Sequence, residues 1–277
     1  STRILELKFV KAGNGAFTLA IDIGGTFTDV VLLDSADGTL AVAKVLTRYP
    51  DPSESVLQGI RLLLVEKEID PARIDRAIHG TTLVTNCLIE RKGARTGLIT
   101  TMGFRDALEI GREGRYDIYD LFLELPKSLV ERRLRLEVQE RLYASGKVMT
   151  PLDKTAVRRA CERFRQEGVE SVSISFLHAY ANPSHEKEAM AVVREMLPDL
   201  PVSVSHEVAA ELREYERTTT TVANSYVQPL AQRYLNRLET GVKDLGISSP
   251  LHMMLSNGGS CSVETAVEFP VRLVESG

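Results

Sequence analysis

Short apolar stretches separated by turn residues dominate the first part of the chain. The stretches 18–22, 27–33 and 39–45 are rich in apolar and β-branched residues and each indicates a strand. Gly24-Gly25 separates the first two, and Ser35-Ala-Asp-Gly38 separates the last two. This order predicts a meander of three strands.

Helical periodicity then alternates with further strands. From Ser53, which we predict as an N-cap, the apolar residues Val56, Ile60, Leu63 and Leu64 share one face of a helix. A second helix is predicted over 81–91, with Leu83, Cys87 and Leu88 inward. A third is predicted over 153–166, capped by Asp153, with Val157, Ala160, Cys161 and Phe164 inward. Another helix begins at Asn182-Pro183, and the last is predicted over 211–243 with a kink or break at Pro229.

The remaining apolar runs predict strands at 77–79, 96–100, 169–177, 201–206 and 252–255. Strands alternating with helices are typical of an α/β sheet. The segment 103–152 has weak periodicity and is predicted to be a loop-rich insertion or the lining of a cleft.

Length and charge narrow the class of protein. The 277 residues predict two lobes or one large α/β unit. The net charge is −4 and both signs are intermixed, whereas a nucleic-acid-binding surface needs a basic face, so we expect no nucleic-acid partner. The charged run 131–141 alternates in sign and is typical of a solvated or interdomain face.

The cysteines and the apolar runs bear on the compartment. Cys87, Cys161 and Cys261 lie far apart, which fits a reducing compartment and predicts three small buried groups rather than disulfides or a zinc site. The sequence has no apolar run of about 18 residues and no secretory signal pattern. We therefore expect a cytoplasmic protein without a membrane partner.

The strongest chemical signal is the turn in Asp22-Ile-Gly-Gly-Thr26-Phe-Thr28-Asp29. Gly24 and Gly25, followed by Thr26 and Thr28, offer backbone N–H groups and hydroxyls where a phosphate can sit. A dinucleotide-binding GxGxxG opens into a helix, and a P-loop ends in Gly-Lys-Ser/Thr. Here a strand follows and no lysine does, so neither of those folds fits.

Two aspartates flank this turn. Asp22, at the end of the first strand, is placed to hold a hydrated Mg²⁺, which takes one or two carboxylates together with phosphate oxygens, and Asp29 is a second, weaker candidate. The alternative is an Asp-Gly-Gly hairpin without a ligand, which leaves both threonines and both aspartates without a role.

This stretch resembles the opening of the hydantoinase A and 5-oxoprolinase family, which includes N-methylhydantoinase and acetone carboxylase β-subunit-like proteins. Further family motifs follow in the same order, and the resemblance extends from Phe17 to Gly277. They are His79-Gly-Thr-Thr82, Thr85-Asn86, 90–101, 103–106, Glu109-Ile-Gly-Arg112, 119–121, Arg213-Glu-Tyr-Glu-Arg217 and Ser256-Asn-Gly-Gly259.

The resemblance implies an α/β fold of the actin-like ATPase (ribonuclease H-like) type, with the first lobe and the beginning of the second hinged about Mg-ATP. It divides the chain into an N-terminal extension (1–16), the family's N-terminal domain (17–205) and the start of the hydantoinase A domain (206–277). Glu275-Ser276-Gly277 resembles the start of a second phosphate-binding turn, and family members continue further. The chain alone is therefore expected to bind ATP poorly.

The family's activities supply the functional hypotheses. The first is an ATP-dependent hydrolase that opens a hydantoin, 5-oxoproline or another lactam after phosphorylation of its carbonyl oxygen. The second is an ATP-dependent ketone carboxylase subunit, and the third is a non-catalytic actin-like nucleotide-binding protein. The family also implies a hydantoinase B-type partner subunit or fused domain and an oligomer. No residue is identified as the general base.

Two motifs beyond the first turn have a functional and a structural interpretation. His79, with Gly80, Thr81 and Thr82, stands at a predicted strand-to-helix junction and either contacts phosphate or substrate or forms a hydrogen-bonded turn. Asn257, Gly258 and Gly259 follow an apolar strand and either approach the nucleotide or form a tight turn.

The irregular middle segment and the last predicted helix carry weaker signals. Arg112, Arg115, Tyr116 and Asp117 either line a substrate pocket or are surface charges. The residues 218–221, four threonines in a row, are predicted to be a helix face rather than a site.

Overall fold

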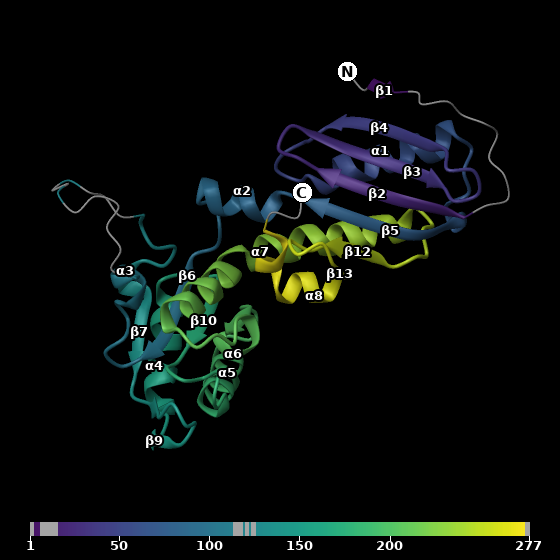
Figure 1. Cartoon of the computed structure of the whole chain (residues 1–277). Helices are drawn as coiled ribbons and strands as arrows, with labels where there is room; N and C mark the ends of the chain where they lie inside the picture. Colours follow the sequence, from purple (N-terminus) through teal and green to yellow (C-terminus); the bar gives the residue numbers. More distant parts are fainter. Residues whose placement is uncertain (1–2, 6–15, 113–118, 120–121, 123–125, 275–277) are drawn as a thin grey trace. The chain divides into compact units, whose positions relative to one another are not determined.

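The computed structural model describes residues 3–5, 16–112, 119, 122 and 126–274. The chain divides into two compact units, which Figure 1 shows with its colours following the sequence. Unit 1 combines Ser1–Glu90 with Leu230–Gly277, and unit 2 is Arg91–Pro229. The ranges 1–16, 17–205 and 206–277 divide the chain by family pattern rather than by packing, and they stay a prediction.

A seven-stranded sheet forms the framework of unit 1. Its order is β1-β4-β3-β2-β5-β12-β13, with the predicted meander of β2, β3 and β4 at its centre. Strands β5 and β12 run parallel to β2, whereas β1 and β13 are antiparallel edge strands. The bounds are β1 Arg3–Leu5, β2 Phe17–Ile23, β3 Phe27–Asp34, β4 Leu40–Leu46, β5 Ile74–Thr81, β12 Leu251–Met254 and β13 Ser260–Ser262.

One face of this meander packs against helix α1 (Ser53–Glu66), and Val56, Ile60, Leu63 and Leu64 are buried there as predicted. The N-cap prediction was wrong, because the cap is Pro52 and the Ser53 hydroxyl bonds to Asp51 Oδ1 at 2.5 Å. Unit 1 also contains η1 (Pro71–Arg73), α2 (Leu83–Glu90), α8 (Val263–Glu268) and η3 (Pro270–Leu273). In α2 the buried residues are Val84 and Cys87, whereas Leu83 and Leu88 are only half-buried.

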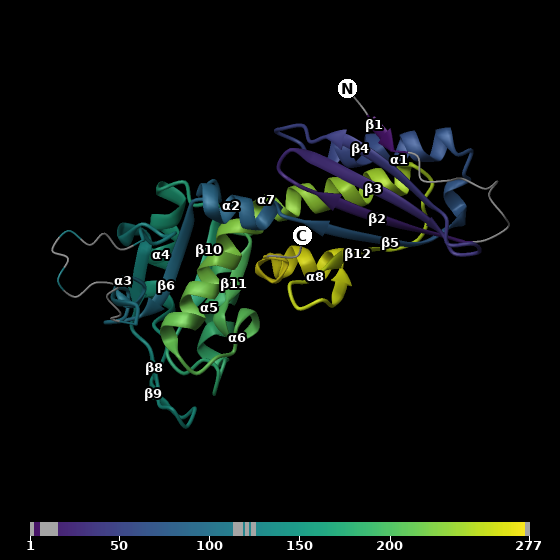
Figure 2. The same cartoon turned by 45° about the horizontal axis from the view of Figure 1, so that its top comes forward.

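Unit 2 is built on a four-stranded parallel sheet in the order β11-β10-β6-β7, shown from a second direction in Figure 2. The bounds are β6 Thr96–Thr101, β7 Arg135–Val138, β10 Ser171–Ser175 and β11 Val202–Val204, with a separate hairpin of β8 (Arg141–Leu142) and β9 (Val148–Thr150). Its helices are α3 (Ala107–Ile110), η2 (Arg132–Leu134), α4 (Lys154–Gln166), α5 (Ser184–Met196) and α6 (Ser205–Val208).

Two helices test the sequence predictions directly. Asp153 caps α4 by accepting the Ala156 N–H at 3.0 Å, and Val157, Ala160, Cys161 and Phe164 are buried, as predicted. Helix α7 (Glu214–Asp244) continues through Pro229, so the chain does not break there. The threonines of 218–221 lie within this helix as predicted, and the Thr218 and Ser175 hydroxyls are 2.8 Å apart.

The charged run 131–141 differs from its prediction as a solvated or interdomain face. It contains β7, and both Arg135 and Glu140 are buried. Arg135 donates to the Val130 carbonyl, and Glu140 accepts from Thr101 and, at 2.8 Å, bonds to His185 Nδ1. Arg135 Nη2 also pairs with Glu109 at 3.0 Å, whereas its Nη1 is buried without a partner among the described residues.

Two further predictions, the burial of the three cysteines and the lack of a membrane-spanning segment, can be compared with the structure. Cys87 and Cys161 are buried, and burial raises the pKa of each thiol to about 11, whereas Cys261 is only partly buried, contrary to its prediction. Within the described part of the chain, no helix is both long and apolar enough to span a membrane.

Candidate functional site

Three parallel strands of unit 1 end at the same edge of the sheet. In the register of β2 and β5, Asp22 lies beside Gly80 and Ile23 beside Thr81, while His79 pairs with Met253 of β12. The predicted motifs lie at these strand ends. The motifs 24–26 and 257–259 follow β2 and β12, and the motif 80–82 comprises the last two residues of β5 and the residue after it. In open α/β sheets, ligands bind outside the carboxyl ends of such strands. The structure therefore brings three predicted motifs to the same edge of the sheet.

The turn between β2 and β3 is held from one side by Thr47. The Thr47 N–H donates to the Thr26 carbonyl and its hydroxyl to the Gly24 carbonyl, both at 2.9 Å. Thr28 is fully buried and its hydroxyl lies 3.1 Å from that of Thr47, so it supports the turn from inside. Gly25 and Thr26 are exposed and present the free side of the turn.

The two aspartates differ in their surroundings. Asp22, Asp29 and Lys44 are directly opposed on β2, β3 and β4 and so share one face of the sheet. Lys44 Nζ donates to both carboxylate oxygens of Asp29, at 2.8 and 2.9 Å. Asp22 is exposed, and no partner of its carboxylate occurs among the described residues. It is the carboxylate available to a cation.

This donor set suits Mg²⁺ rather than a metal held in a protein cage. Among the residues that the structure describes, no three His, Cys, Asp or Glu side chains gather as a metal site. Mg²⁺ usually keeps several waters and takes one or two carboxylates with phosphate oxygens. Asp22 beside the exposed turn fits that requirement.

The surroundings of Gly25 show why a glycine stands there. Neither Gly24 nor Gly25 has a φ in the left-handed region. A Cβ added to Gly25 would meet only Asn86 Nδ2, at 3.8 Å, which is an ordinary contact. The folded chain itself therefore has room for a side chain at Gly25, and close approach of a ligand to this glycine stays a prediction.

His79 lies inside the unit. Its Nδ1 is 3.2 Å from the Ile21 carbonyl and its Nε2 is 2.7 Å from the Tyr234 hydroxyl. A carbonyl only accepts, so Nδ1 carries the proton and Nε2 accepts from Tyr234. Burial lowers the pKa of His79 to about 4, against the raising effect of the Ile21 carbonyl. The structure favours the structural interpretation, and a catalytic role for His79 stays a prediction.

The threonines after His79 connect β2 to α2. Thr81 Oγ1 accepts the Leu83 N–H at 3.1 Å, and Thr82 donates to the Ile23 carbonyl from both its N–H and its hydroxyl. Asn86 Nδ2 donates to Thr82 Oγ1 at 3.3 Å. These bonds fix the position of Gly80, Thr81 and Thr82 beside the Gly24-Gly25 turn.

The motif 257–259 forms the turn of the β12–β13 hairpin. Gly258 has a φ of +82°, and the Gly259 N–H donates to Asn257 Oδ1 at 3.0 Å. The geometry is that of a tight turn, and contact of Asn257, Gly258 and Gly259 with nucleotide stays a prediction. Ser276 and Gly277, predicted for the second phosphate turn, lie outside the described residues.

Three residues at this edge were missing from the predicted site. Lys44 reaches it through strand register, Thr47 reaches it through hydrogen bonds from the residue after β4, and Asn86 reaches it from α2. The only signal in the sequence was Asn86 within a family motif and Lys44 as a lone charge in an apolar strand.

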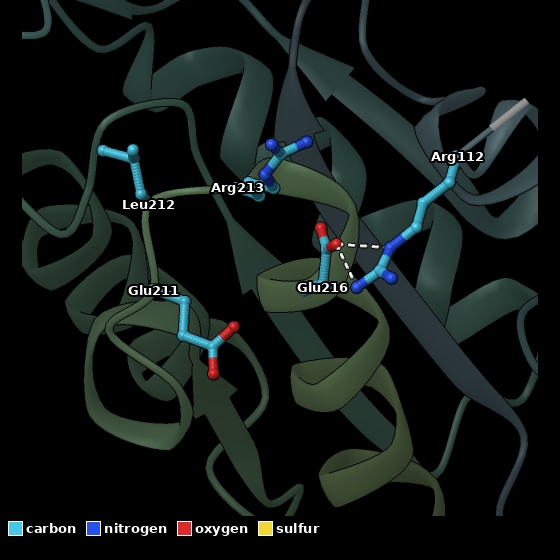
Figure 3. Close-up of a pocket in the computed structure, with 5 residues that line it drawn as sticks. All are labelled: Arg112, Glu211, Leu212, Arg213 and Glu216. Atoms are coloured by element: carbon cyan, nitrogen blue, oxygen red, sulfur yellow. Dashed lines mark hydrogen bonds and ion pairs between the residues drawn. The ribbon is translucent and has the colours of Figure 1, made fainter.

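Unit 2 has a pocket of about 510 Å³ where two further family motifs meet. Figure 3 shows the residues that line it: Arg112, Glu211, Leu212, Arg213 and Glu216. Arg112 Nε and Nη2 each lie 2.6 Å from Glu216 Oε1. Gly111, with a φ of +58°, lies beside the Tyr215 ring. Arg115, Tyr116 and Asp117 fall outside the described residues.

Comparison with known proteins adds relatives of known activity. The chain is 38% identical to caprolactamase subunit alpha of Pseudomonas jessenii over 94% of this chain and 38% of the relative. It is 34% identical to the acetophenone carboxylase gamma subunit of Aromatoleum aromaticum, over 89% and 36%. It is 31% identical to 5-oxoprolinase of Saccharomyces cerevisiae, over 88% and 22%. The chain thus spans less than two fifths of the length of these relatives.

Solved structures agree with these matches. Nucleotide-free acetone carboxylase superposes with a TM-score of 0.85 at 26% identity, covering 95% of this chain and 39% of that one. The ATP-dependent caprolactamase of Pseudomonas jessenii superposes with a TM-score of 0.82 at 35% identity, covering 92% and 38%. The mixed α/β sheets shared with these proteins agree with the predicted actin-like ATPase fold.

Family models account for most of the chain. The hydantoinase/oxoprolinase N-terminal region matches residues 18–197, and a second model, hydantoinase/oxoprolinase, matches residues 217–277. Together with the ordered motifs and the shared fold, these matches show that the chain belongs to the hydantoinase/oxoprolinase family.

Proposed function

We propose that this chain supplies the phosphate-binding part of an ATP-dependent enzyme that opens a cyclic amide. The observation that carries the proposal is that the motifs 24–26, 80–82 and 257–259 lie at the carboxyl ends of strands in one sheet, beside the exposed Asp22. Two relatives, a caprolactamase subunit and 5-oxoprolinase, are named for cyclic amides. The same substrate class is therefore the first choice here.

Each residue has a defined part in this proposal. The backbone N–H groups of Gly25 and Thr26 face the phosphates, while Thr28 and Thr47 hold the turn in shape. Asp22 holds a hydrated Mg²⁺, which supplies positive charge to the phosphate groups when bound. Lys44 neutralises Asp29, so the second carboxylate does not repel the phosphates.

The chemistry explains the need for ATP. An amide carbonyl is a poor electrophile because the nitrogen lone pair is delocalised onto it. Phosphorylation of the carbonyl oxygen by ATP removes that stabilisation and releases ADP. Water would then add to the activated carbon, and cleavage of the ring C–N bond, with a proton going to the departing nitrogen, would give an acyl phosphate. A second water would release phosphate and leave the open-chain amino acid. The residues of this chain bind and orient the phosphates, and we assign no described residue as the general base.

Carboxylation is the second candidate function. The acetophenone carboxylase gamma subunit is as similar to this chain as 5-oxoprolinase is, and acetone carboxylase shares the fold. In that reaction the same phosphate site would serve activation of a ketone enolate or bicarbonate. A hydantoinase B-type partner subunit is proposed for either reaction, because the caprolactamase and acetophenone carboxylase relatives are named as subunits.

ADP release by the full-length protein with its partner subunit distinguishes these functions. A panel of lactams, hydantoins, and ketones with bicarbonate is offered, and we expect stimulation by a lactam or hydantoin. If only a ketone with bicarbonate stimulates ADP release, the result would support the carboxylase function and contradict the hydrolase function. Absence of stimulation by every member of the panel would reject both.

Asp22→Asn tests the metal assignment in the same assay. We expect at least a 100-fold loss of substrate-dependent ADP release with an unchanged melting temperature, because the exposed Asp22 carboxylate contributes little to folding. Asp75→Asn, an exposed carboxylate on β5 of the same sheet, is the matched control and should turn over like wild type. Wild-type turnover in Asp22→Asn would remove Asp22 from the site.

A further inference from the structure

We propose that the pocket of unit 2 binds a small zwitterion, an amino acid whose ammonium and carboxylate groups are separated by a short aliphatic chain. Arg213 binds the carboxylate, Glu211 binds the ammonium group, and Leu212 contacts the aliphatic chain. These residues belong to unit 2, whereas the phosphate turns belong to unit 1.

Of the four charged side chains that line the pocket, two are paired with each other and two make no hydrogen bond or ion pair within the described part of the chain. Arg112 and Glu216 satisfy each other through two contacts of 2.6 Å to one carboxylate oxygen. Arg213 and Glu211 are exposed, and neither side chain has a hydrogen bond or ion pair to any described residue. Figure 3 shows their charged ends pointing away from each other, with no dashed line between them. Arg213 acts on Glu216 through its charge alone, which helps to lower the pKa of that carboxyl, so one cation and one anion have no bonded partner among the residues described.

The loop that presents these charges is fixed from beneath by a buried arginine. Arg217, which is 1% exposed, donates to the Glu211 carbonyl at 2.6 Å, to the Leu212 carbonyl at 3.3 Å and to the Phe176 carbonyl at 3.0 Å. Its Nε donates to Ser205, whose hydroxyl donates to the buried Glu186. A loop held in this way loses little freedom when a ligand binds, which favours binding.

The composition of the pocket excludes a simple anion as the preferred ligand. Glu211 and Glu216 repel a second negative charge, and Glu214 and Glu216 already occupy the first turn of α7, where the helix dipole would otherwise attract an anion. The side chain of Leu212 is 69% exposed between the two unpaired charges in the sequence. A ligand with one charge of each sign and an aliphatic part complements the types of side chain that line the pocket.

A ring-opened lactam is an amino acid of this kind, and that link to the reaction is the only part of the inference that rests on the proposed function. The charges of the pocket stand without it. Binding is therefore measured without ATP, partner subunit or turnover, so failure of the pocket and failure of the proposed reaction give separate results.

The test is an NMR titration of the 277-residue chain at low ionic strength with three probes of equal length. They are 6-aminohexanoate, which carries both charges, hexanoate, which lacks the ammonium group, and hexylammonium, which lacks the carboxylate. We expect 6-aminohexanoate to bind about 10-fold more tightly than either single-charge probe, and to weaken with added salt. Equal affinity for hexanoate, or no saturable shift with 6-aminohexanoate, would overturn the proposal.

Variants assign the two charges. Arg213→Gln should weaken 6-aminohexanoate and hexanoate about 10-fold, whereas Glu211→Gln should weaken 6-aminohexanoate and leave hexanoate unchanged or slightly tighter. Arg194→Gln and Glu162→Gln remove exposed charges on α5 and α4 and serve as matched controls. The inference fails if Arg213→Gln or Glu211→Gln binds 6-aminohexanoate as its control does.

Discussion

At the scale of single residues, a glycine can be required by a left-handed φ or by the close approach of another group, and Gly25 allows these two reasons to be distinguished. Its φ is not in the left-handed region, and a Cβ would have room in the folded chain. Gly38, in the next turn of the same sheet, is the opposite case, with a φ of +76° and nothing within 4 Å of an added Cβ. The left-handed φ explains the glycine at position 38. For Gly25 the explanation that we predict is close approach of a ligand.

Gly25→Ala should therefore melt like wild type without nucleotide but lose most of the rise in melting temperature that Mg-ATP gives the full-length protein, because only the liganded state meets the new methyl group. Gly38→Ala should lower the melting temperature equally with and without nucleotide. Thermal melts of both variants with and without Mg-ATP provide the measurement. Equal nucleotide-induced rises in wild type and Gly25→Ala would contradict a phosphate-binding role for the turn.

His79 makes stability depend on pH. The unfolded chain binds a proton at this residue near pH 6.5, whereas the folded chain binds it only near pH 4 because the ring is buried. Between these values the unfolded state holds more protons, so stability falls as the pH falls and levels off above the window. Between pH 6.5 and 5 the loss from this residue is up to about 2 kcal/mol.

Urea unfolding across this range in wild type and His79→Gln isolates that contribution. We expect the variant to be less stable at pH 7, because it changes two buried hydrogen bonds, and to show a shallower loss of unfolding free energy toward pH 5. Parallel pH profiles would mean that His79 takes up its proton in the folded state as readily as in water.

At the scale of elements, helix α4 shows what a local sequence pattern can specify. Its cap, its inward residues and its last residue, Gln166, were all predicted, and Gly168 follows with a φ of +65°. Asp153→Ala should lower the unfolding free energy by about 1 kcal/mol, since it leaves the Ala156 N–H without its acceptor.

Chemical denaturation of Asp153→Ala measures this loss. The control is Glu162→Ala, which changes an exposed side chain in the middle of the same helix and should stay within about 0.5 kcal/mol of wild type. Equal stability of the Asp153 and Glu162 variants would show that the cap bond contributes nothing measurable.

Elements stabilised by distant partners escaped prediction. Strand β7 was missed because its charged residue Arg135 is buried against the Val130 carbonyl and Glu109, and no local pattern shows such pairing. The candidate site divides in the same way. The turn between β2 and β3 is local and was predicted. Lys44 enters through strand register and Thr47 through hydrogen bonds to a turn about 20 residues earlier, and the periodicity of one strand specifies neither.

At the scale of the whole molecule, each unit has a core of its own. In unit 2, Phe164 is fully buried, and a Cβ on Gly97 would lie 2.5 Å from its ring. In unit 1, a Cβ on Gly59 would lie 2.7 Å from Val30 Cγ2. The two glycines thus offer matched steric changes in separate cores.

Gly97→Ala should cost roughly 1–3 kcal/mol through overpacking and should raise amide hydrogen exchange in unit 2 while leaving β2, β3 and β4 protected. Gly59→Ala should have the reverse effect. Hydrogen exchange read by mass spectrometry in each variant provides the measurement. Equal acceleration in both units would show that they unfold as one.

The order of the strands along the chain also sets the order of events on the ribosome. Strand β5 is synthesised early, but its neighbour β12 belongs to the second segment of unit 1. Ala77 in β5 therefore cannot pair with Leu251 in β12 until that later segment has been made. All of unit 2, which is continuous in sequence, is synthesised in the interval and can fold first. Until then one edge of β5 exposes unpaired backbone groups to other nascent chains. The sheet of unit 1 is thus completed only after the whole of unit 2 has been synthesised.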